Sequence, residues 1–435
     1  PCLHILTDDP QGLLVAAAIS AHDAVLHLFE LCCHPILAEH PAGKADKVED
    51  VTVLPSEGTG WSLPSLAVSN HLALPRSFVF FSLADASPFG SSVSRLETFA
   101  QCPYQHFVRY GLAPQREQQP GVDAAELGTL YHEAAERFTE AVTALPEFPE
   151  VPQAVCDRLM DEAVSPLIDA WRESPMGESK RGEAVARRIR RTAKRTARNI
   201  LSQYADSSFR PLRMEFVFGQ NGLSPIVLEL SDGTFVYLQG RIDRVDVMTG
   251  GGLRVIDYKS GARKFDPTLV YWGLQLQLLL YLAAALSRVP GSHAAGFFYC
   301  RIADPTVKTE SRIREEVEKQ IAKKLSLQGI SLSDVAILRA QGGNVASMVT
   351  KDGKPNGRYA ASMVDEAGME KLLDFAKRKA AELAGEIYRG EMDDSPVERG
   401  AFNACQNCEY SAICAFDPMR KPRRRLAAKK LDDLL

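Results

Sequence analysis

The spacing of apolar residues changes along the chain, from a helical period in its first half to strand-like alternation after Pro211. Residues 91–110, 128–145 and 155–171 are predicted to be helices. The clearest helical spacing belongs to the second of them, with apolar side chains at Leu130, Ala134, Phe138 and Val142.

The pattern in the second half of the chain predicts a sheet. Short runs of β-branched and aromatic residues between turn residues predict strands at 213–218, 226–230, 235–247, 253–258 and 295–300. A strongly apolar helix at 272–286 separates the last two strands, and a long amphipathic helix is predicted at 369–388. Helices flanking a central mixed β-sheet place the protein in the α/β class.

Length and charge limit the possible classes of protein. A chain of 435 residues, 45% of them hydrophobic, suggests two or three domains. The net charge of −4 gives no global sign of a nucleic-acid partner, so such a partner must be sought in local charge clusters. No run of 18 apolar residues occurs, which predicts no membrane span.

Three regions are expected along the chain. Residues 1–85 carry no chemical motif, and a start at Pro1 rather than Met suggests a fragment of a longer polypeptide or a chain processed at its start. Gly43-Lys44 lacks the flanking residues of a phosphate-binding loop, so this chain alone should not hydrolyse ATP. A functional unit is expected over 86–420, followed at 421–435 by a basic and then acidic tail that is mobile at its end.

A carboxylate–lysine pattern carries the candidate chemistry. Asp243 and Asp257 lie on two predicted strands joined by a glycine turn, so that antiparallel pairing brings both carboxylates to one end of the sheet. Such oxygens bind Mg²⁺ or Mn²⁺, and the main-chain carbonyl of Tyr258 is a further candidate ligand. Lys259 lies on the same strand face as Asp257, where its charge can stabilise a phosphodiester transition state.

An Asp-x-Lys triplet alone is a weak signal, because a solvated strand end with an incidental ion pair has the same sequence. The apolar strand around Asp257 strengthens it, since burying a carboxylate without a functional partner is unfavourable. His132 is a candidate imidazole ligand for the same ion, and Glu215 a candidate for water-mediated binding. Gln277 and Tyr281, one turn apart on a predicted helix, either hold the Lys259 strand or contact the DNA backbone.

Three of the nine cysteines form the pattern Cys405-x2-Cys408-x5-Cys414, which indicates metal binding in a reducing compartment, by default the cytoplasm. Cys102 is the best candidate for a fourth ligand. The spacing leaves zinc and a [4Fe–4S] cluster open, and a disulfide with spare thiols is the third alternative. The remaining five are expected to be small buried apolar residues: Cys2, Cys32, Cys33, Cys156 and Cys300.

A basic segment between Lys180 and Arg198 contains nine Lys or Arg residues and one acidic residue, Glu183. Helical spacing places four of these cations on one face, which is expected to bind DNA phosphates without reading bases: Arg187, Arg191, Lys194 and Arg198. An ordinary solvated charged face is the alternative.

The ordered motifs resemble one known family. The set Leu127-Gly-x-x-x-His, Gly240-Arg-Ile-Asp-Arg, Ile256-Asp-Tyr-Lys-Ser-Gly and Gln277-x-x-x-Tyr is similar to the RecB-type branch of the PD-(D/E)XK nucleases. The resemblance implies metal binding by residues matching His132, Asp243 and Asp257. It also implies a catalytic role for the residue matching Lys259 and places Gln277 in the same site.

One cysteine before the core and three after it resemble the arrangement in AddB-type subunits of bacterial AddAB helicase–nucleases, and the segment Ser94–Tyr104 resembles them closely. This resemblance implies that residues 86–420 form the nuclease domain, with a [4Fe–4S] cluster as a structural clasp, and that residues 1–85 are the end of a helicase-like domain. It also implies an exonuclease or endonuclease acting on single-stranded DNA ends that an AddA-type motor partner unwinds, in double-strand break repair. A stand-alone iron–sulfur nuclease and a catalytically silent DNA-binding scaffold remain the alternatives.

Overall fold

The computed structural model describes residues 90–114, 124–173, 179–220, 223–308 and 313–435. The contacts divide the chain into two compact units. The described residues of the larger unit lie within Ser91–Glu97, Gln119–Glu382 and Ala427–Leu435. Those of the smaller unit are Gly90 and residues within Thr98–Gln118 and Leu383–Leu426. The region expected over 1–85, with Gly43-Lys44, Cys2, Cys32 and Cys33, lies outside the described residues.

A mixed sheet forms the centre of the larger unit. Its strands are β1 (Gly90–Ser92), β2 (Phe209–Phe218), β3 (Ile226–Glu229), β4 (Phe235–Met248), β5 (Gly252–Lys259), β6 (His293–Arg301), β7 (Gln328–Leu332) and β8 (Met363–Val364). The order is β1-β4-β5-β6-β7-β8, and β2 and β3 both pair with β4. The β4–β5 and β6–β7 pairs are antiparallel, whereas β5–β6 and β7–β8 are parallel. The expected mixed sheet of an α/β protein is confirmed.

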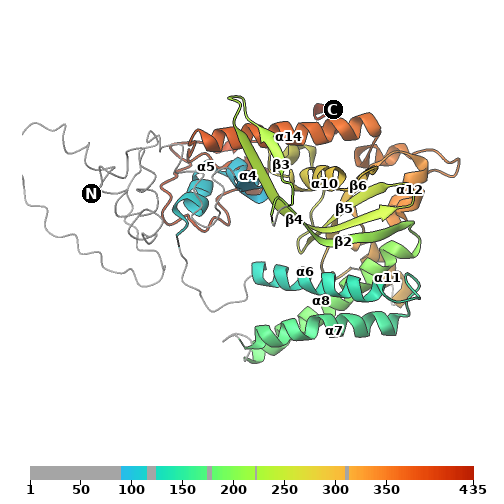
Figure 1. Ribbon diagram of the computed structural model, residues 1–435. Coiled ribbons are helices and arrows are strands. Elements are labelled where there is room, and N and C mark those ends of the chain that lie inside the picture. Colours follow the sequence, from blue (N-terminus) through green and yellow to red (C-terminus); the bar gives the residue numbers. More distant parts are fainter. Residues whose placement is uncertain (1–89, 115–123, 174–178, 221–222, 309–312) are drawn as a thin grey trace, which may run out of the picture. The chain divides into compact units, whose positions relative to one another are not determined.

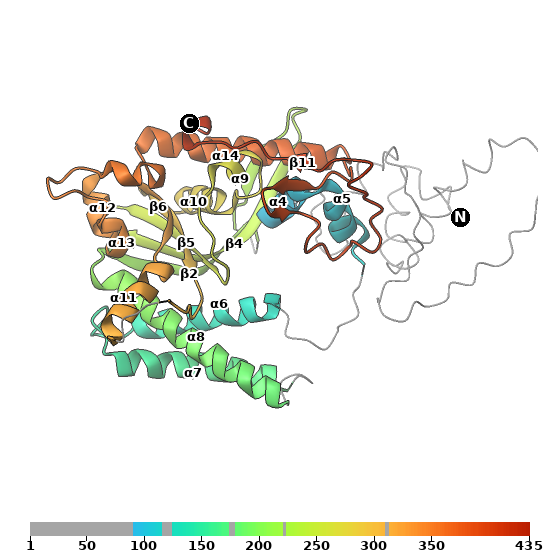
Figure 2. The same cartoon turned by 180° about the vertical axis from the view of Figure 1, so that it is seen from behind.

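Helices pack on both faces of this sheet. Three long helices lie together on one side, α6 (Ala124–Thr143), α7 (Gln153–Arg172) and α8 (Lys180–Ala205), and α10 (Gln277–Arg288) lies on the other (Figures 1 and 2). The apolar faces of α6–α8 share a core with Ile256, Tyr258 and Phe298 of β5 and β6. Seven of the eight residues of β5 are buried, among them the charged Arg254 and Asp257.

The predicted helix at 272–286 differs from the structure. It is divided into α9 (Pro267–Tyr271) and α10, because Gly273 at φ 79° adopts the left-handed conformation that ends a helix. The end of the chain, expected to be mobile, packs instead: Trp272 Nε1 donates to the carbonyl of Ala427 at 3.1 Å, and Lys429 lies 4.2 Å from the Tyr271 ring centre.

The remaining elements of the larger unit cover the far end of the sheet and the chain terminus. They are α11 (Arg314–Leu325), α12 (Val335–Gln341), α13 (Gly343–Ala346), η3 (Gly357–Ser362) and η4 (Leu431–Asp433). Two helices span the division between the units, α4 (Val93–Gln101) and α14 (Glu366–Tyr388). No helix in the described part of the chain is long and apolar enough to cross a lipid bilayer.

The smaller unit consists of short elements. They are α5 (Pro103–His106), η2 (Phe107–Leu112) and a three-stranded sheet of β9 (Val397–Arg399), β10 (Phe402–Asn403) and β11 (Arg424–Arg425). Phe107, Val108 and Tyr410 form its small core. Hydrogen bonds join its two distant segments, since Tyr104 N donates to Asp393 O at 3.1 Å and Arg424 Nη2 donates to Ala100 O at 2.7 Å.

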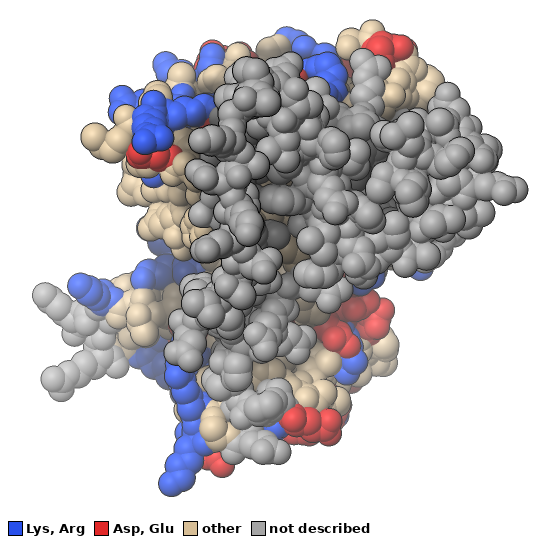
Figure 3. Space-filling view, turned by 90° about the vertical axis from the view of Figure 1, so that its left-hand side faces the viewer, with Lys and Arg blue, Asp and Glu red and all other residues tan. Residues whose placement is uncertain are grey.

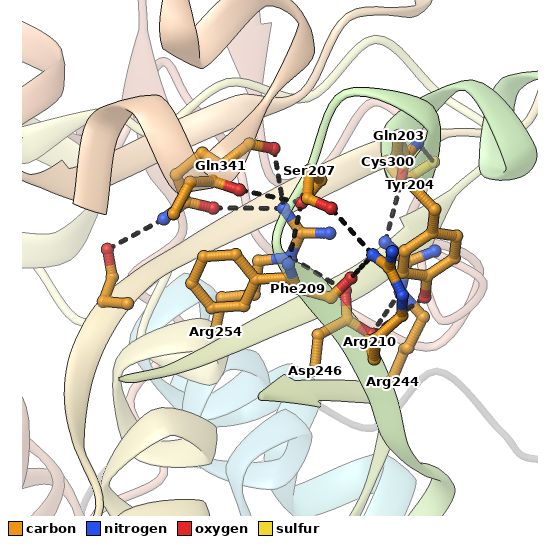
Figure 4. A network of polar contacts seen from close by, with 12 residues as sticks. Gln203, Tyr204, Ser207, Phe209, Arg210, Arg244, Asp246, Arg254, Cys300 and Gln341 are labelled. Carbon is orange, nitrogen blue, oxygen red and sulfur yellow. Dashed lines mark hydrogen bonds and ion pairs between the residues drawn. The ribbon is translucent and has the colours of Figure 1, made fainter. Parts of the chain in front are cut away.

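A buried ionic network connects α8 to β4 and β5 (Figure 4). The carboxylate of Asp246 lies between two fully buried arginines, 3.2 Å from Arg244 Nε and 2.8 Å from Arg254 Nε. Tyr204 of α8 donates to the same carboxylate at 2.9 Å, and Arg244 Nη1 donates to the Tyr258 hydroxyl at 3.1 Å. Because Arg244 and Tyr258 directly follow Asp243 and Asp257, this network holds the two strands that carry those carboxylates.

Candidate active site

The two predicted acidic residues meet at one end of the β4–β5 pair. The last paired residues of these strands are Arg244 and Ile256, so that Asp243 and Asp257 stand at the next position on each strand. Asp243 is fixed there, because the backbone N–H of Tyr258 donates to its Oδ2 at 2.7 Å. The structure thus brings together the two carboxylates that the sequence places there.

Asp257 and Lys259 form a close pair on β5. The Lys259 Nζ lies 2.7 Å from Asp257 Oδ2, and the carboxylate is almost fully buried whereas the lysine is partly exposed. Burial, and then the charge of Asp243, raise the pKa of Asp257 to about 6 against the opposing effect of Lys259. Neither Asp257 oxygen has a hydrogen-bond partner among the described residues apart from this ion pair. A buried carboxylate with free lone pairs suits a cation.

Three ligand atoms converge beside it. One ligand atom each from His132, Glu215 and Asp243 lies within 4.8 Å of the other two. His132 projects from α6, and its Nδ1 is 3.4 Å from Asp243 Oδ2. Glu215 has φ 46°, a left-handed conformation that strains a residue with a side chain and aims its carboxylate here. An imidazole and carboxylate oxygens within this radius fit a hard divalent cation.

The charges at the site are coupled. Burial lowers the pKa of His132, but the hydrogen bond and the charge of Asp243 outweigh it and raise the pKa overall. Burial and the charge of Asp243 raise the pKa of Glu215, although Arg241 is 3.3 Å away. The charge of Asp243 thus acts on both Asp257 and Glu215. A bound divalent cation would relieve this repulsion between neighbouring carboxylates.

Glu97 is a site component that the sequence did not reveal. It lies in α4 and is partly buried, and its Oε1 accepts from the backbone N–H groups of Leu276 and Gln277 at 2.8 and 3.0 Å. The N-terminus of α10 has no side-chain cap of its own, so Glu97 supplies the acceptor from a distant segment. The hint in the sequence was an acidic residue in an otherwise apolar helix face, beside Leu96 and Phe99.

Gln277 and Tyr281 support the site from α10. Gln277 Nε2 donates to the Tyr281 hydroxyl at 3.0 Å, and the Tyr281 ring packs on Phe218 with 5.8 Å between ring centres. Tyr281 is only 6% exposed. Of the two roles open from the sequence, this burial favours holding the site over contacting a DNA backbone.

The basic face predicted on α8 is largely ion-paired. Arg191 pairs with Asp304, Lys194 with Asp161 at 2.6 Å and Arg198 with Asp157 at 2.5 Å. Arg187 is 3.9 Å from Glu183, but this side chain and that of Arg191 are about 70% exposed. Figure 3 shows Lys and Arg side chains low in the view, at the level of α7 and α8 in Figure 1. Asp157, Asp161 and Asp304 come from other elements, which the local sequence could not reveal.

The four predicted cluster ligands lie together in the smaller unit. Cys102 is the residue before α5, and it lines one cavity with Cys405, Cys408 and Cys414. Burial, and then the neighbouring thiols, raise the pKa of Cys102 to about 11. Tyr104 and Phe416 complete much of the lining. All four thiols are free of disulfides, and burial also raises the pKa of Cys408 and Cys414.

Two other cysteines lie in the core. Cys156 and Cys300 belong to the core between α6–α8 and the sheet, as expected. Cys300 accepts from Gln203 Nε2 at 3.3 Å.

Comparisons with known proteins agree with this geometry. The family model described as the PD-(D/E)XK nuclease superfamily matches residues 91–415. Proteins named as the B subunit of an ATP-dependent helicase/deoxyribonuclease are similar to the chain. That of Alkaliphilus metalliredigens is 34% identical over 349 residues, 76% of this chain and 30% of its own length. That of Clostridium tetani is 34% identical over 369 residues, 80% of this chain and 32% of its own. The chain therefore spans about a third of these relatives.

Proposed function

Because the chain belongs to the PD-(D/E)XK nuclease superfamily, we propose that it is the nuclease part of a helicase–deoxyribonuclease B subunit. The convergence of His132, Asp243, Asp257 and Lys259 at one end of β4 and β5 carries this proposal. A catalytically silent scaffold has no need of a buried carboxylate–lysine pair whose oxygens lack other partners.

Mg²⁺ or Mn²⁺ is the proposed metal. His132, Asp243 and Asp257 would hold it, with the Tyr258 carbonyl as a further ligand and Glu215 bound directly or through water. When bound, such an ion polarises a phosphodiester and lowers the pKa of water. Lys259 would turn from Asp257 towards the reacting phosphate and stabilise its developing charge. Gln277, held by Tyr281 and by the capped end of α10, would keep Lys259 in place.

The proposed substrate is a single-stranded DNA end, cleaved by exonuclease action in the cytoplasm during double-strand break repair. Relatives are named as B subunits of ATP-dependent helicase/deoxyribonucleases. An AddA-type motor subunit would therefore unwind the DNA, as no chemical motif for ATP hydrolysis occurs in this sequence. Arg187 and Arg191, the most exposed of the four α8 cations, would contact phosphates, with Lys194 and Arg198 behind them.

The cysteine site is proposed to hold a [4Fe–4S] cluster. Cys102, Cys405, Cys408 and Cys414 line one cavity, and none of the four is in a disulfide. Four cysteines are ligands for zinc as well as for a [4Fe–4S] cluster. The cluster is proposed over zinc because the cysteine arrangement and the segment Ser94–Tyr104 resemble those of AddB-type subunits. The cluster would clasp two segments of the smaller unit that are about three hundred residues apart.

The test is a cleavage assay on anaerobically purified chain. Labelled single-stranded DNA is incubated with Mg²⁺, with Mn²⁺ or with EDTA, and the products are resolved by length. We expect metal-dependent cleavage that begins at DNA ends. Cleavage that persists in EDTA, or none with either ion, contradicts the proposal. Circular single-stranded DNA is the matched substrate that separates exonuclease from endonuclease action.

A further inference from the structure

The β3–β4 hairpin exposes an apolar strip that the proposed active site does not use. Along β4, Phe235 and Tyr237 are 46% and 39% exposed, whereas Val236 and Leu238 between and beyond them are fully buried. Val227 of β3 is paired opposite Tyr237 and is 52% exposed. Exposed aromatic residues in alternate positions of one strand indicate a binding surface, since the other face already forms the core.

The same strand leads directly to the metal site. The alternating exposed positions continue from Tyr237 to Arg241, whose side chain is 64% exposed, and Asp243 follows two residues later. Arg241 Nη1 lies 3.3 Å from Glu215 Oε2, and a guanidinium has further donors for a phosphate. Aromatic rings, then an exposed cation, then the candidate metal ligands are therefore arranged in line along β4.

We propose that this strip, defined as Phe235, Tyr237, Val227 and Arg241, binds single-stranded DNA and leads it to the metal site. The inference rests on the proposed nuclease function and names how the substrate strand is held. Bases would stack on the two rings, and the phosphate nearer the metal would bind Arg241. A double helix is excluded from this mode because its bases have no free faces.

The spacing of the strip matches that role. Alternate residues of a strand are about 6.8 Å apart. This is twice the 3.4 Å between stacked bases in one strand of a duplex, so that each ring can lie between two unstacked bases. Glu229, paired opposite Phe235, repels phosphate at the distal end, so contact there is by stacking. Stacking on aromatic residues tolerates any sequence, so this mode of binding needs no base-specific contact.

The test measures binding and chemistry separately. Fluorescence anisotropy with labelled oligo-dT in EDTA gives affinity without cleavage. The double variant Phe235→Ala/Tyr237→Ala should bind at least about fivefold more weakly for each lost ring. Tyr237→Phe, which keeps the ring, should bind normally, and so should Leu212→Ala, which removes an exposed apolar side chain on β2 outside the strip. Affinity for a blunt duplex of equal length should not change.

Cleavage of bis(p-nitrophenyl) phosphate separates this inference from the proposed function. That diester has no bases, so the double variant should cleave it as fast as wild type while losing activity on oligo-dT. Unchanged affinity of the double variant for oligo-dT overturns the inference. So does full affinity in Phe235→Leu/Tyr237→Leu, which would make the strip merely apolar. If the wild-type protein shows no metal-dependent cleavage at all, the nuclease proposal is wrong instead. The binding measurements then still decide whether the strip binds single-stranded DNA.

Discussion

Glu97 accepts a hydrogen bond from the backbone N–H of Gln277 at 3.0 Å, although the two residues are far apart in the sequence. The backbone N–H of Leu276 donates a second hydrogen bond to the same carboxylate oxygen and completes the cap of α10. A side chain from α4 thereby fixes the helix that carries Gln277 and Tyr281. Because this carboxyl is partly buried and bonded to the helix, its ionisation state affects the stability of the fold.

Glu97→Gln should change how stability depends on pH. Burial raises the pKa of Glu97 from 4.5 to about 7, although Arg263 and Lys259 oppose this. The folded state therefore binds this proton more tightly than the unfolded chain, and the associated stability, present below pH 4.5, is lost as pH rises through 7. At 1.36 kcal/mol per pKa unit, the shift in the pKa of Glu97 corresponds to about 3 kcal/mol in the free energy of unfolding. Relative to wild type, the free energy of unfolding of Glu97→Gln should therefore rise by about this amount between pH 5 and pH 8. Urea unfolding measures it.

Glu97→Ala is the complementary variant. It leaves both N–H groups without their acceptor at every pH, which should destabilise the protein by about 1–2 kcal/mol. A stability difference between Glu97→Gln and wild type that is the same at pH 5 and pH 8 would show that the carboxyl does not titrate as described.

Some of this site could be predicted from the sequence, and some could not. Asp257 and Lys259 were predictable, because a charged pair inside an apolar strand conflicts with its surroundings and the strand period fixes their shared face. Glu97 was not, since its partners are backbone groups of a helix about 180 residues away. The same limit applies to α8, where Asp157, Asp161 and Asp304 approach from other elements. Gly273 could have revealed the break before α10.

Asp246→Ala should be severely destabilising. It would leave the guanidinium groups of Arg244 and Arg254 buried without their shared counter-ion, which typically costs about 3–5 kcal/mol. Chemical unfolding measures the effect. The matched control is Asp161→Ala, which removes a half-exposed partner of Lys194 and should change stability by less than about 1 kcal/mol. Equal effects of the two substitutions would mean that the buried network does not stabilise the fold.

Lys259→Ala should abolish cleavage while leaving the fold and DNA affinity largely intact. Loss of a charge-stabilising donor at the reacting phosphate typically lowers the rate about a hundredfold or more. Asp257→Ala should have a similar effect through loss of a metal ligand. Cleavage kinetics and oligonucleotide binding are measured side by side, with the exposed Lys264→Ala as the control. Full activity of Lys259→Ala would remove the proposed mechanism.

Ca²⁺ should support cleavage poorly compared with Mg²⁺ or Mn²⁺. Ca²⁺ prefers more ligands at longer distances, 2.3–2.6 Å instead of 2.0–2.1 Å, and acidifies bound water less. The site supplies few protein ligands: the ligand atoms of His132, Glu215 and Asp243 converge, and Asp257 lies on the neighbouring strand. Initial rates at matched ion concentrations measure this, and calorimetry checks that Ca²⁺ binds. Equal rates with Ca²⁺ would count against a metal-activated nucleophile at this site.

The last prediction concerns the cysteine site, which should hold the smaller unit together without taking part in chemistry. Cys102→Ala and Cys405→Ala should each lose the iron and sulfide found in the anaerobically purified protein. The free energy of metal–thiolate bonding is then lost from folding. The segments 98–114 and 383–426, which meet through few buried apolar residues, should become sensitive to protease.

Cys300→Ala is the matched control, because that thiol lies in the core of the larger unit and outside the cavity of the four cysteines. It should keep full iron and sulfide content, with a modest loss of stability from the missing sulfur. Metal analysis beside limited proteolysis of the three variants decides the matter. Zinc in place of iron would contradict the cluster assignment, and a full cluster in Cys102→Ala would mean that the fourth ligand lies elsewhere.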